Sequence, residues 1–275
     1  MPIIQVFILL ATGLAIGLIS GLLGIGGGII LTPVQYWLYT SNGLSTDLAI
    51  KMSFATSLAV IFPTAASGVW QHQKTGRIYW KAAIFMGIFT AAGSFIGASL
   101  AAYIPGSALK IAFGCVTLAV AIRMLAVKIS DTDNPIRENL WLWFALALPL
   151  GIITGILGLG GGIFVVPVLV LVLRFRLHNA MATSLGMLLF TSAGGIAGWV
   201  INGTRVANLP PFSIGYILWP AFVVLAIGSI TMAQVGARVA PRVPGKYLNY
   251  AFVALLFYIS LDMLGAVDWI VHHFS

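Results

Sequence analysis

Two runs of three consecutive glycines interrupt apolar segments of this chain, and each run could bind an anion through main-chain amides. The first run is Gly26, Gly27 and Gly28, and the second is Gly160, Gly161 and Gly162, 134 residues later. A helix that begins at Gly28 or Gly162 leaves its first N–H groups without partners, at the positive end of the helix dipole. Because glycine has no side chain, an anion can approach such amides directly. The pattern therefore predicts an anion site at the glycine runs.

Hydroxyl side chains are the second set of candidate donors, because they can hold an oxyanion without placing a full charge in the membrane. Thr56 and Ser57 lie in the string ATSL, which recurs in the second half of the chain with Thr183 and Ser184. Each hydroxyl alone could instead bond to its own helix or join two helices. Their recurrence in register favours a common role near the site.

Ionisable side chains inside the apolar segments are few. No lysine or arginine lies deep in any segment, and the four histidines flank segments without ligand spacing. Asp262 stands in the run YISLDMLGAV and is a candidate for coupling transport to an ion, although a solvated group near the interface would also fit. Nothing resembles a catalytic triad, a metal site or a cofactor site, so we do not expect an enzyme or a cofactor.

The composition shows which elements must position these groups. The 275 residues are 60% hydrophobic and 7% charged, with a mean hydropathy of +1.05. Soluble domains carry about 25% charged residues. Several apolar stretches exceed the roughly 18 residues that indicate a spanning helix. We therefore predict an all-α, multi-pass membrane protein. The net charge of +8 comes from single basic residues in short loops, so it does not indicate nucleic-acid binding.

The glycine runs belong to a longer internal repeat. The string GLISGLLGIGGGIILTPV at 17–34 recurs as GIITGILGLGGGIFVVPV at 151–168, so that Ser20 matches Thr154. Four later matches follow in the same order, and the offset between matched residues drifts from 134 to 127 to 139. Such ordered matches predict a duplicated fold. The predicted units are a first repeat over 1–128, a polar connecting loop over 129–138 and a second repeat over 139–275. The expected apolar segments are about 3–23, 28–40, 49–71, 80–104, 107–128, 139–158, 162–174, 179–201, 213–237 and 246–271.

The distribution of lysine and arginine residues distinguishes between two possible membrane topologies. If 3–40 and 139–174 each crossed the membrane once, the fourteen Lys and Arg residues would divide seven and seven between its sides. If each glycine run instead closes a hairpin, eleven share one side, and only Lys51, Lys110 and Arg205 face the other. The second division obeys the positive-inside rule. It predicts a broken-helix hairpin followed by three transmembrane helices in each half, with the halves inverted and both termini outside.

Paired breaks in membrane segments are typical of transporters with a site near mid-membrane, because unpaired backbone is tolerated only in protein or along a cavity. Close helix packing is the alternative, and it suits Gly13, Gly17 and Gly21 better than the triplets. We expect one small anion between the arms that begin at Gly28 and Gly162. The predicted substrate-binding residues are Gly26, Gly27, Gly28, Thr56, Ser57, Gly160, Gly161, Gly162, Thr183 and Ser184.

At these motifs, GLLGIGGGIILTP and GILGLGGGIFVVP with two ATSL strings, the chain resembles the sulfite exporter TauE/SafE family of membrane permeases. The resemblance implies a bacterial inner-membrane transporter of small sulfur-containing oxyanions, such as sulfite or organosulfonates. The implied partners are the anionic substrate, the lipid bilayer and a coupling proton or sodium ion, and the oligomeric state is left open. A permease for another small solute or a metal cation is the alternative, which the shortage of buried carboxylates, histidines and cysteines disfavours.

Overall fold

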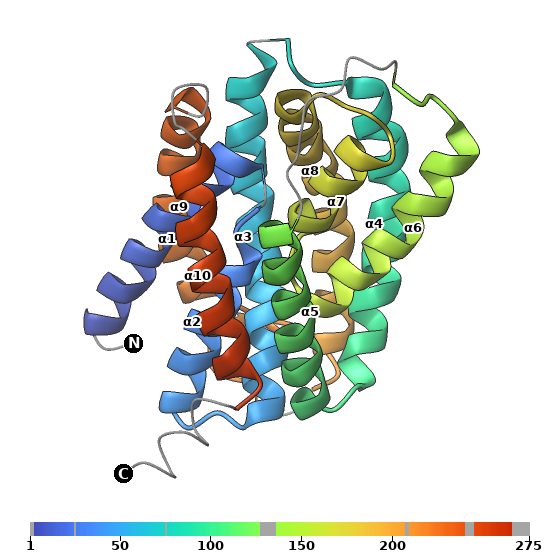
Figure 1. Cartoon of the computed structure of the whole chain (residues 1–275). Helices are drawn as coiled ribbons and strands as arrows, with labels where there is room; N and C mark the ends of the chain where they lie inside the picture. The colour runs from blue at the N-terminus through green and yellow to red at the C-terminus, as the bar shows by residue number, and fades with distance from the viewer. Residues whose placement is uncertain are drawn as a thin grey trace.

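The computed structural model describes residues 3–24, 26–74, 76–126, 136–206, 209–239 and 245–265 (Figure 1). Within these ranges the elements are α1 (Ile3–Leu23), α2 (Gly28–Ser41), α3 (Thr46–Gln73), α4 (Trp80–Tyr103), α5 (Gly106–Ala126), α6 (Leu140–Leu157), α7 (Gly162–Leu171), α8 (Leu177–Gly203), β1 (Ser213–Ile214), β2 (Ile217–Leu218), α9 (Trp219–Val239) and α10 (Gly245–Met263). Seven of the described helices, α1, α3, α4, α5, α6, α8 and α9, are long and apolar enough to span a membrane. The prediction of an all-α, multi-pass membrane protein is confirmed.

One expected segment is wrong at its beginning. The apolar stretch 213–237 does not start as a helix, because β1 and β2 form a short antiparallel hairpin before α9. The turn between the strands contains Gly215, whose φ is 57°. Glycine adopts this left-handed conformation readily, so the turn reverses the chain within two residues.

Each glycine run closes a helical hairpin, as the charge division predicts. The open end of the first hairpin is joined by a hydrogen bond from Gln5 Nε2 in α1 to Asn42 Oδ1 after α2, at 2.8 Å. The open end of the second is joined by a bond from Arg137 N before α6 to Leu173 O after α7, at 3.1 Å. The returning arms α2 and α7 have 14 and 10 residues. At about 1.5 Å per residue they are too short to cross a hydrocarbon core of about 30 Å.

Small residues pack the long arm of each hairpin against a helix of the other half, α1 on α9 and α6 on α4. A Cβ on Gly17 would lie 2.3 Å from Ser229 O, and one on Gly151 would lie 2.4 Å from Thr90 O. The repeat relates these two contacts, because Gly17 matches Gly151 and Thr90 matches Ser229. The halves therefore interlock by exchanging equivalent contacts. The packing interpretation of Gly13, Gly17 and Gly21 is confirmed, since each lies against the backbone of α9.

The two hairpins open toward opposite ends of the bundle. In Figure 1 the α2–α3 and α4–α5 connections lie at the lower end of the bundle, and the end of α3 and the start of α4 lie at the upper end. The open end of the second hairpin is also at the upper end, where Tyr79 before α4 packs edge-on against Phe175 after α7. There Lys81 and Tyr79 donate hydrogen bonds to Glu138, which lowers the pKa of that carboxyl group. The inversion of the halves across a membrane stays a prediction.

Charged and aromatic residues mark two boundaries around the bundle. Exposed tryptophans and a tyrosine occur near both ends, as they do in membrane-interface belts. They are Trp70, Trp80 and Trp141 on elements at the upper end and Trp37, Tyr103 and Trp219 on elements at the lower end. Seven of the eleven basic residues predicted to share one side lie in segments at the upper end: Lys74, Arg77, Lys81, Arg137, Arg174, Arg176 and Arg238. Of the other four, Arg123 lies in the last turn of α5 and Lys246 in the first turn of α10, whereas Lys128 and Arg242 lie outside the described residues.

Cysteine labelling tests which side of the membrane the upper end faces. In a Cys115→Ser background, Lys74→Cys and Arg176→Cys are expected to resist a membrane-impermeant thiol reagent added to intact cells, because the positive-inside rule places them in the cytoplasm. Ser41→Cys, at the lower end, is the control and is expected to react. Labelling of Lys74→Cys or Arg176→Cys from outside would contradict the predicted orientation.

Candidate functional site

The glycine runs adopt a backbone that other residues rarely adopt. We call residues 24 and 26–28 the first break and residues 158–162 the second break. Gly24, Gly26 and Gly27 have φ values of 69°, 82° and 75°, and the matching Gly158, Gly160 and Gly161 have 64°, 70° and 94°. Glycine reaches positive φ without the steric penalty of a Cβ. The repeated glycines are therefore needed for the same chain path in both halves.

Each break leaves main-chain donors unpaired inside the protein. The carbonyl of Gly27 accepts from Ile30 N and Leu31 N, so the intrahelical bonds of α2 begin there. The amides of Gly28 and Ile29 have no hydrogen-bond acceptor among the described residues, and both residues are buried. Gly162 and Ile163 at the start of α7 have the same arrangement, with Gly161 O accepting the first bonds. Buried amides of this kind need a partner, and an anion at a helix N-terminus can supply it.

The two breaks meet in the middle of the bundle. A Cβ on Gly26 or on Gly160 would touch the same two side chains, Ile61 of α3 and Leu188 of α8. Ile61 and Leu188 are themselves matched by the repeat, at the offset of 127. A Cβ on Gly28 would lie 2.8 Å from Gly158 O, so α2 begins beside the second break. The neighbour of this N-terminus is thus the end of α6, and the expectation that both short arms hold one anion between them stays a prediction.

Thr56 and Thr183 lie at matched positions and make matched bonds between the halves. Thr56 Oγ1 accepts from Leu218 N at 3.1 Å, and Thr183 Oγ1 accepts from Tyr79 N at 3.0 Å. Leu218 is the residue before α9, and Tyr79 is the residue before α4. Both hydroxyl oxygens therefore satisfy a helix start of the opposite half. Their role in binding a substrate stays a prediction.

Those two bonds carry a testable consequence for stability. In Thr56→Val or Thr183→Val the partly buried N–H of Leu218 or Tyr79 loses its acceptor, and the net loss of one hydrogen bond costs about 0.5–1.5 kcal/mol. Each variant should therefore unfold at a lower temperature than wild type in the same detergent, as followed by circular dichroism. Thr40→Val is the control, because its hydroxyl bonds only to carbonyls of its own helix. An unchanged midpoint in both buried variants would show that these bonds do not stabilise the fold.

Ser57 and Ser184 lie close to the first break or its short arm. Ser184 Oγ donates to Gly24 O at 2.9 Å, across the two halves. Ser57 Oγ accepts from Gln35 Nε2 at 3.0 Å and lies 3.3 Å from Thr32 Oγ1, both on α2. The structure therefore brings both serines to the first half's hairpin, although they come from different halves.

Gln35 and Tyr39 extend this buried polar cluster, and neither was predicted from the sequence. Tyr39 Oη donates to Gln35 Oε1 at 3.0 Å. Both residues are buried, with exposed fractions of 2% for Tyr39 and 0% for Gln35. Amide and phenol groups buried in a membrane segment are costly and mark candidate functional positions. The missed signal was the spacing of Thr32, Gln35 and Tyr39, which lie on one face of α2 at intervals of three and four residues.

The one charged candidate from the sequence, Asp262, lies away from the breaks. Asp262 lies in the last turn of α10, a helix that packs mainly against α5, and its side chain is partly buried. Its role in ion coupling stays a prediction. Arg123, at the end of α5, is exposed.

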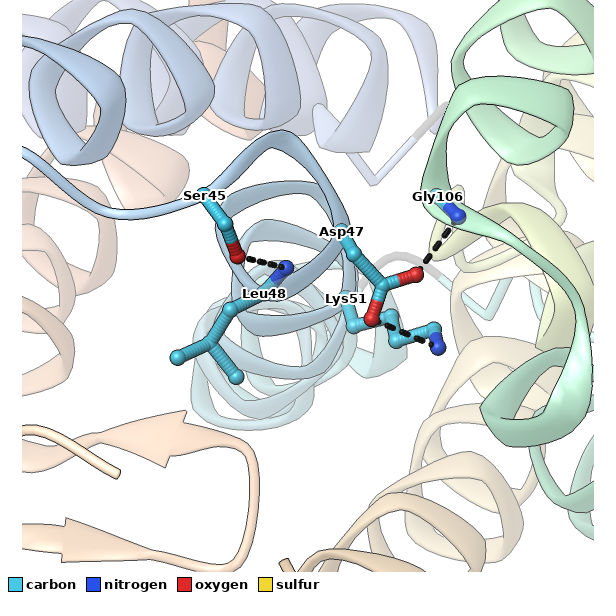
Figure 2. Close-up of polar contacts among 5 residues, drawn as sticks. All are labelled: Ser45, Asp47, Leu48, Lys51 and Gly106. Atoms are coloured by element: carbon cyan, nitrogen blue, oxygen red, sulfur yellow. Dashed lines mark hydrogen bonds and ion pairs between the residues drawn. The ribbon is translucent and has the colours of Figure 1, made fainter. Parts of the chain in front are cut away.

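One lysine is more buried than the sequence analysis expects. Lys51 in the second turn of α3 is 6% exposed, and its ammonium pairs with Asp47 Oδ2 at 3.0 Å (Figure 2). Lys51 lies near the start of α3 and not deep in the segment, and Asp47 belongs to the first turn of the same helix. Asp47 Oδ1 also accepts from Gly106 N at 2.6 Å, so the carboxylate ties the start of α5 to α3. The Lys51–Asp47 ion pair therefore has a structural role, which is to join α3 and α5 at the lower end of the bundle.

The described residues contain no group of three or more histidine, cysteine or acidic side chains placed to hold a metal ion. Similarity to known proteins identifies the family of this chain. The sequence pattern of the family Sulfite exporter TauE/SafE matches residues 9–263. The chain belongs to this family.

Relatives cover nearly the whole chain. A probable membrane transporter protein of Methanocaldococcus jannaschii is 28% identical over 258 residues, which is 94% of each chain. One of Haemophilus influenzae is 27% identical over 272 residues, covering 94% of this chain and 97% of the relative. YunE of Bacillus subtilis, also a probable membrane transporter protein, is 23% identical over 275 residues. No solved structure matches the chain. The TauE/SafE chain described here is thus a multi-pass membrane transporter with two glycine breaks at its centre.

Proposed function

We propose that this TauE/SafE protein is a permease for small sulfur-containing oxyanions, such as sulfite or organosulfonates, that works by alternating access. The observation that carries the proposal is the pair of buried helix N-termini with unpaired amides at the middle of the bundle. The family's description as sulfite exporters supports the class of substrate.

Neutral donors suit a protein that must release its ligand. A charge-assisted hydrogen bond is about twice as strong as a neutral one, so a buried arginine would slow release. Main-chain amides and hydroxyls give several weaker bonds, each worth about 0.5–1.5 kcal/mol net. The nearest neighbours of a Cβ on Gly26, Gly28 or Gly160 would be apolar side chains and backbone atoms.

Coupling and sidedness complete the proposal. Asp262 is the candidate for binding a coupling proton or sodium ion, because it is an acidic residue in an apolar helix. Inverted halves would let one hairpin open toward each side in turn, around breaks that stay in place. Transport rather than catalysis fits the family, so we assign no enzymatic activity.

Reconstitution into proteoliposomes tests the function. Purified protein should move sulfite or an organosulfonate faster than protein-free liposomes do, and should move zinc or manganese no faster than they do. The panel should include sulfite, sulfate, sulfoacetate, phosphate and both cations. Movement of a cation without any of the sulfur anions would contradict the proposal and favour the alternative of a metal permease.

A further inference from the structure

The two breaks share one backbone but differ in the side chains around them. We propose that the anion binds at the first break only, held by the amides that begin α2 and by the hydroxyl of Ser20, on the hairpin that also carries the buried polar cluster of Thr32, Gln35 and Tyr39. The second break then repeats the chain path without holding a ligand. This inference rests on the proposed transport of an oxyanion and names where in the chain the anion binds.

Ser20 is the first observation. It lies on α1 one turn beyond Ile16, and Ile16 Cγ2 would lie 2.1 Å from a Cβ on Gly27. Residues four apart share a helix face, so Ser20 faces the start of α2. Ser20 is 1% exposed, and its hydroxyl has no hydrogen-bond partner among the described residues. A buried hydroxyl without a partner is costly, and an anion at the unpaired amides would satisfy it.

The matching residue of the second half shows the contrast. Thr154 touches Gly161 as expected from the repeat, with its Cγ2 2.8 Å from where a Cβ would lie. Its hydroxyl, however, donates to Gly151 O at 2.9 Å within its own helix. A methyl group therefore lies against the second break, and the hydroxyl there is already satisfied.

The short arms α2 and α7 also differ, because α2 carries buried polar side chains where α7 carries apolar ones. On α2, Thr32 and Gln35 face Ser57 with hydrogen-bonding groups. At the matched positions α7 carries Val166 and Leu169, which are 6% and 0% exposed. Buried polar groups are retained against a cost, whereas the apolar pair carries none. The first arm alone therefore offers hydroxyl and amide groups that could reorganise around a polar ligand.

The experiment compares matched variants by calorimetric titration of sulfite, under nitrogen, into the folded full-length protein. Ser20→Ala should weaken binding about 2- to 13-fold, the loss of one neutral hydrogen bond. Thr154→Ala, its control in the repeat, should change affinity less than about 2-fold. Ser20→Thr keeps a hydroxyl and should bind close to wild type. The wild-type stoichiometry should be one anion per chain.

A second pair of variants keeps the inference testable if Ser20→Ala is unstable. Gln35→Leu gives α2 the residue type that α7 carries and should weaken sulfite binding, whereas Gln5→Leu, at another buried glutamine, should not. Equal losses at Ser20 and Thr154, two anions per chain, or full affinity in Ser20→Ala and Gln35→Leu would overturn the inference. A wild-type protein that binds no sulfur oxyanion at all would instead contradict the proposed function.

Discussion

Gly27→Val is expected to abolish anion transport while the protein still inserts into the membrane. Gly27 has a φ of 75°, and a Cβ there would lie 2.1 Å from Ile16 Cγ2. A β-branched residue both resists this conformation and fills the space beside the amides that begin α2. Gly161→Val should have the same effect, because its φ is 94° and its Cβ would lie 2.8 Å from Thr154 Cγ2. Uptake into proteoliposomes measures the loss, and size-exclusion chromatography reports the folded fraction.

Gly43→Val separates strain from crowding in this experiment. Gly43 also has a positive φ, 85°, but a Cβ there would meet nothing within 4 Å. Strain alone costs about 1–2 kcal/mol, which a folded protein can tolerate. Gly43→Val should therefore transport at a rate close to wild type. Full transport by Gly27→Val would show that this glycine is needed neither for the chain path nor for the site.

Gly21→Leu and Gly155→Leu are expected to prevent folding rather than to impair binding. Their Cβ atoms would lie 2.2 Å from the carbonyl oxygens of Ala233 and Ser94, which are backbone atoms of a neighbouring helix. Overpacking a core against side chains costs about 1–3 kcal/mol, and displacing a whole helix should cost more. The expected result is little monodisperse protein after solubilisation, measured against wild type.

Gly68→Ala is the matched control for helix packing. Its Cβ would lie 3.1 Å from Leu185 Cδ1, at the end of a flexible side chain that can move. It should give a wild-type yield of monodisperse protein. Normal yields of Gly21→Leu and Gly155→Leu would mean that the two halves do not interlock through these glycines.

Much of the architecture could be predicted, because repeated glycines and prolines indicate where helices break and basic residues indicate which loops share a side of the membrane. The repeat located both breaks, and the helices begin at Gly28 and Gly162 as expected. Charge division identified the hairpins because basic residues in short loops follow one side of the membrane. The exchange of α1 and α6 between halves was not predictable, since small residues indicate close packing without naming the partner helix.

The site was harder to predict than the fold for two physical reasons. Thr56 and Thr183 recur in register, but recurrence does not separate a ligand donor from a bond that joins the halves. Gln35 is matched by Leu169 in the second half, so the repeat does not indicate a polar role at this position. Lys51 is buried because its stem packs inside the bundle while Asp47 neutralises its charge, which segment position alone does not reveal.

The position of a bound anion tests the central claim most directly. Crystals of the wild-type protein grown with selenite, a heavier analogue of sulfite, would give anomalous scattering from selenium. The account predicts one selenium peak at the first break, with selenite oxygens within about 3.2 Å of the amides of Gly28 and Ile29 and of Ser20 Oγ. A peak at Lys51 or Arg123, or at the second break alone, would contradict it.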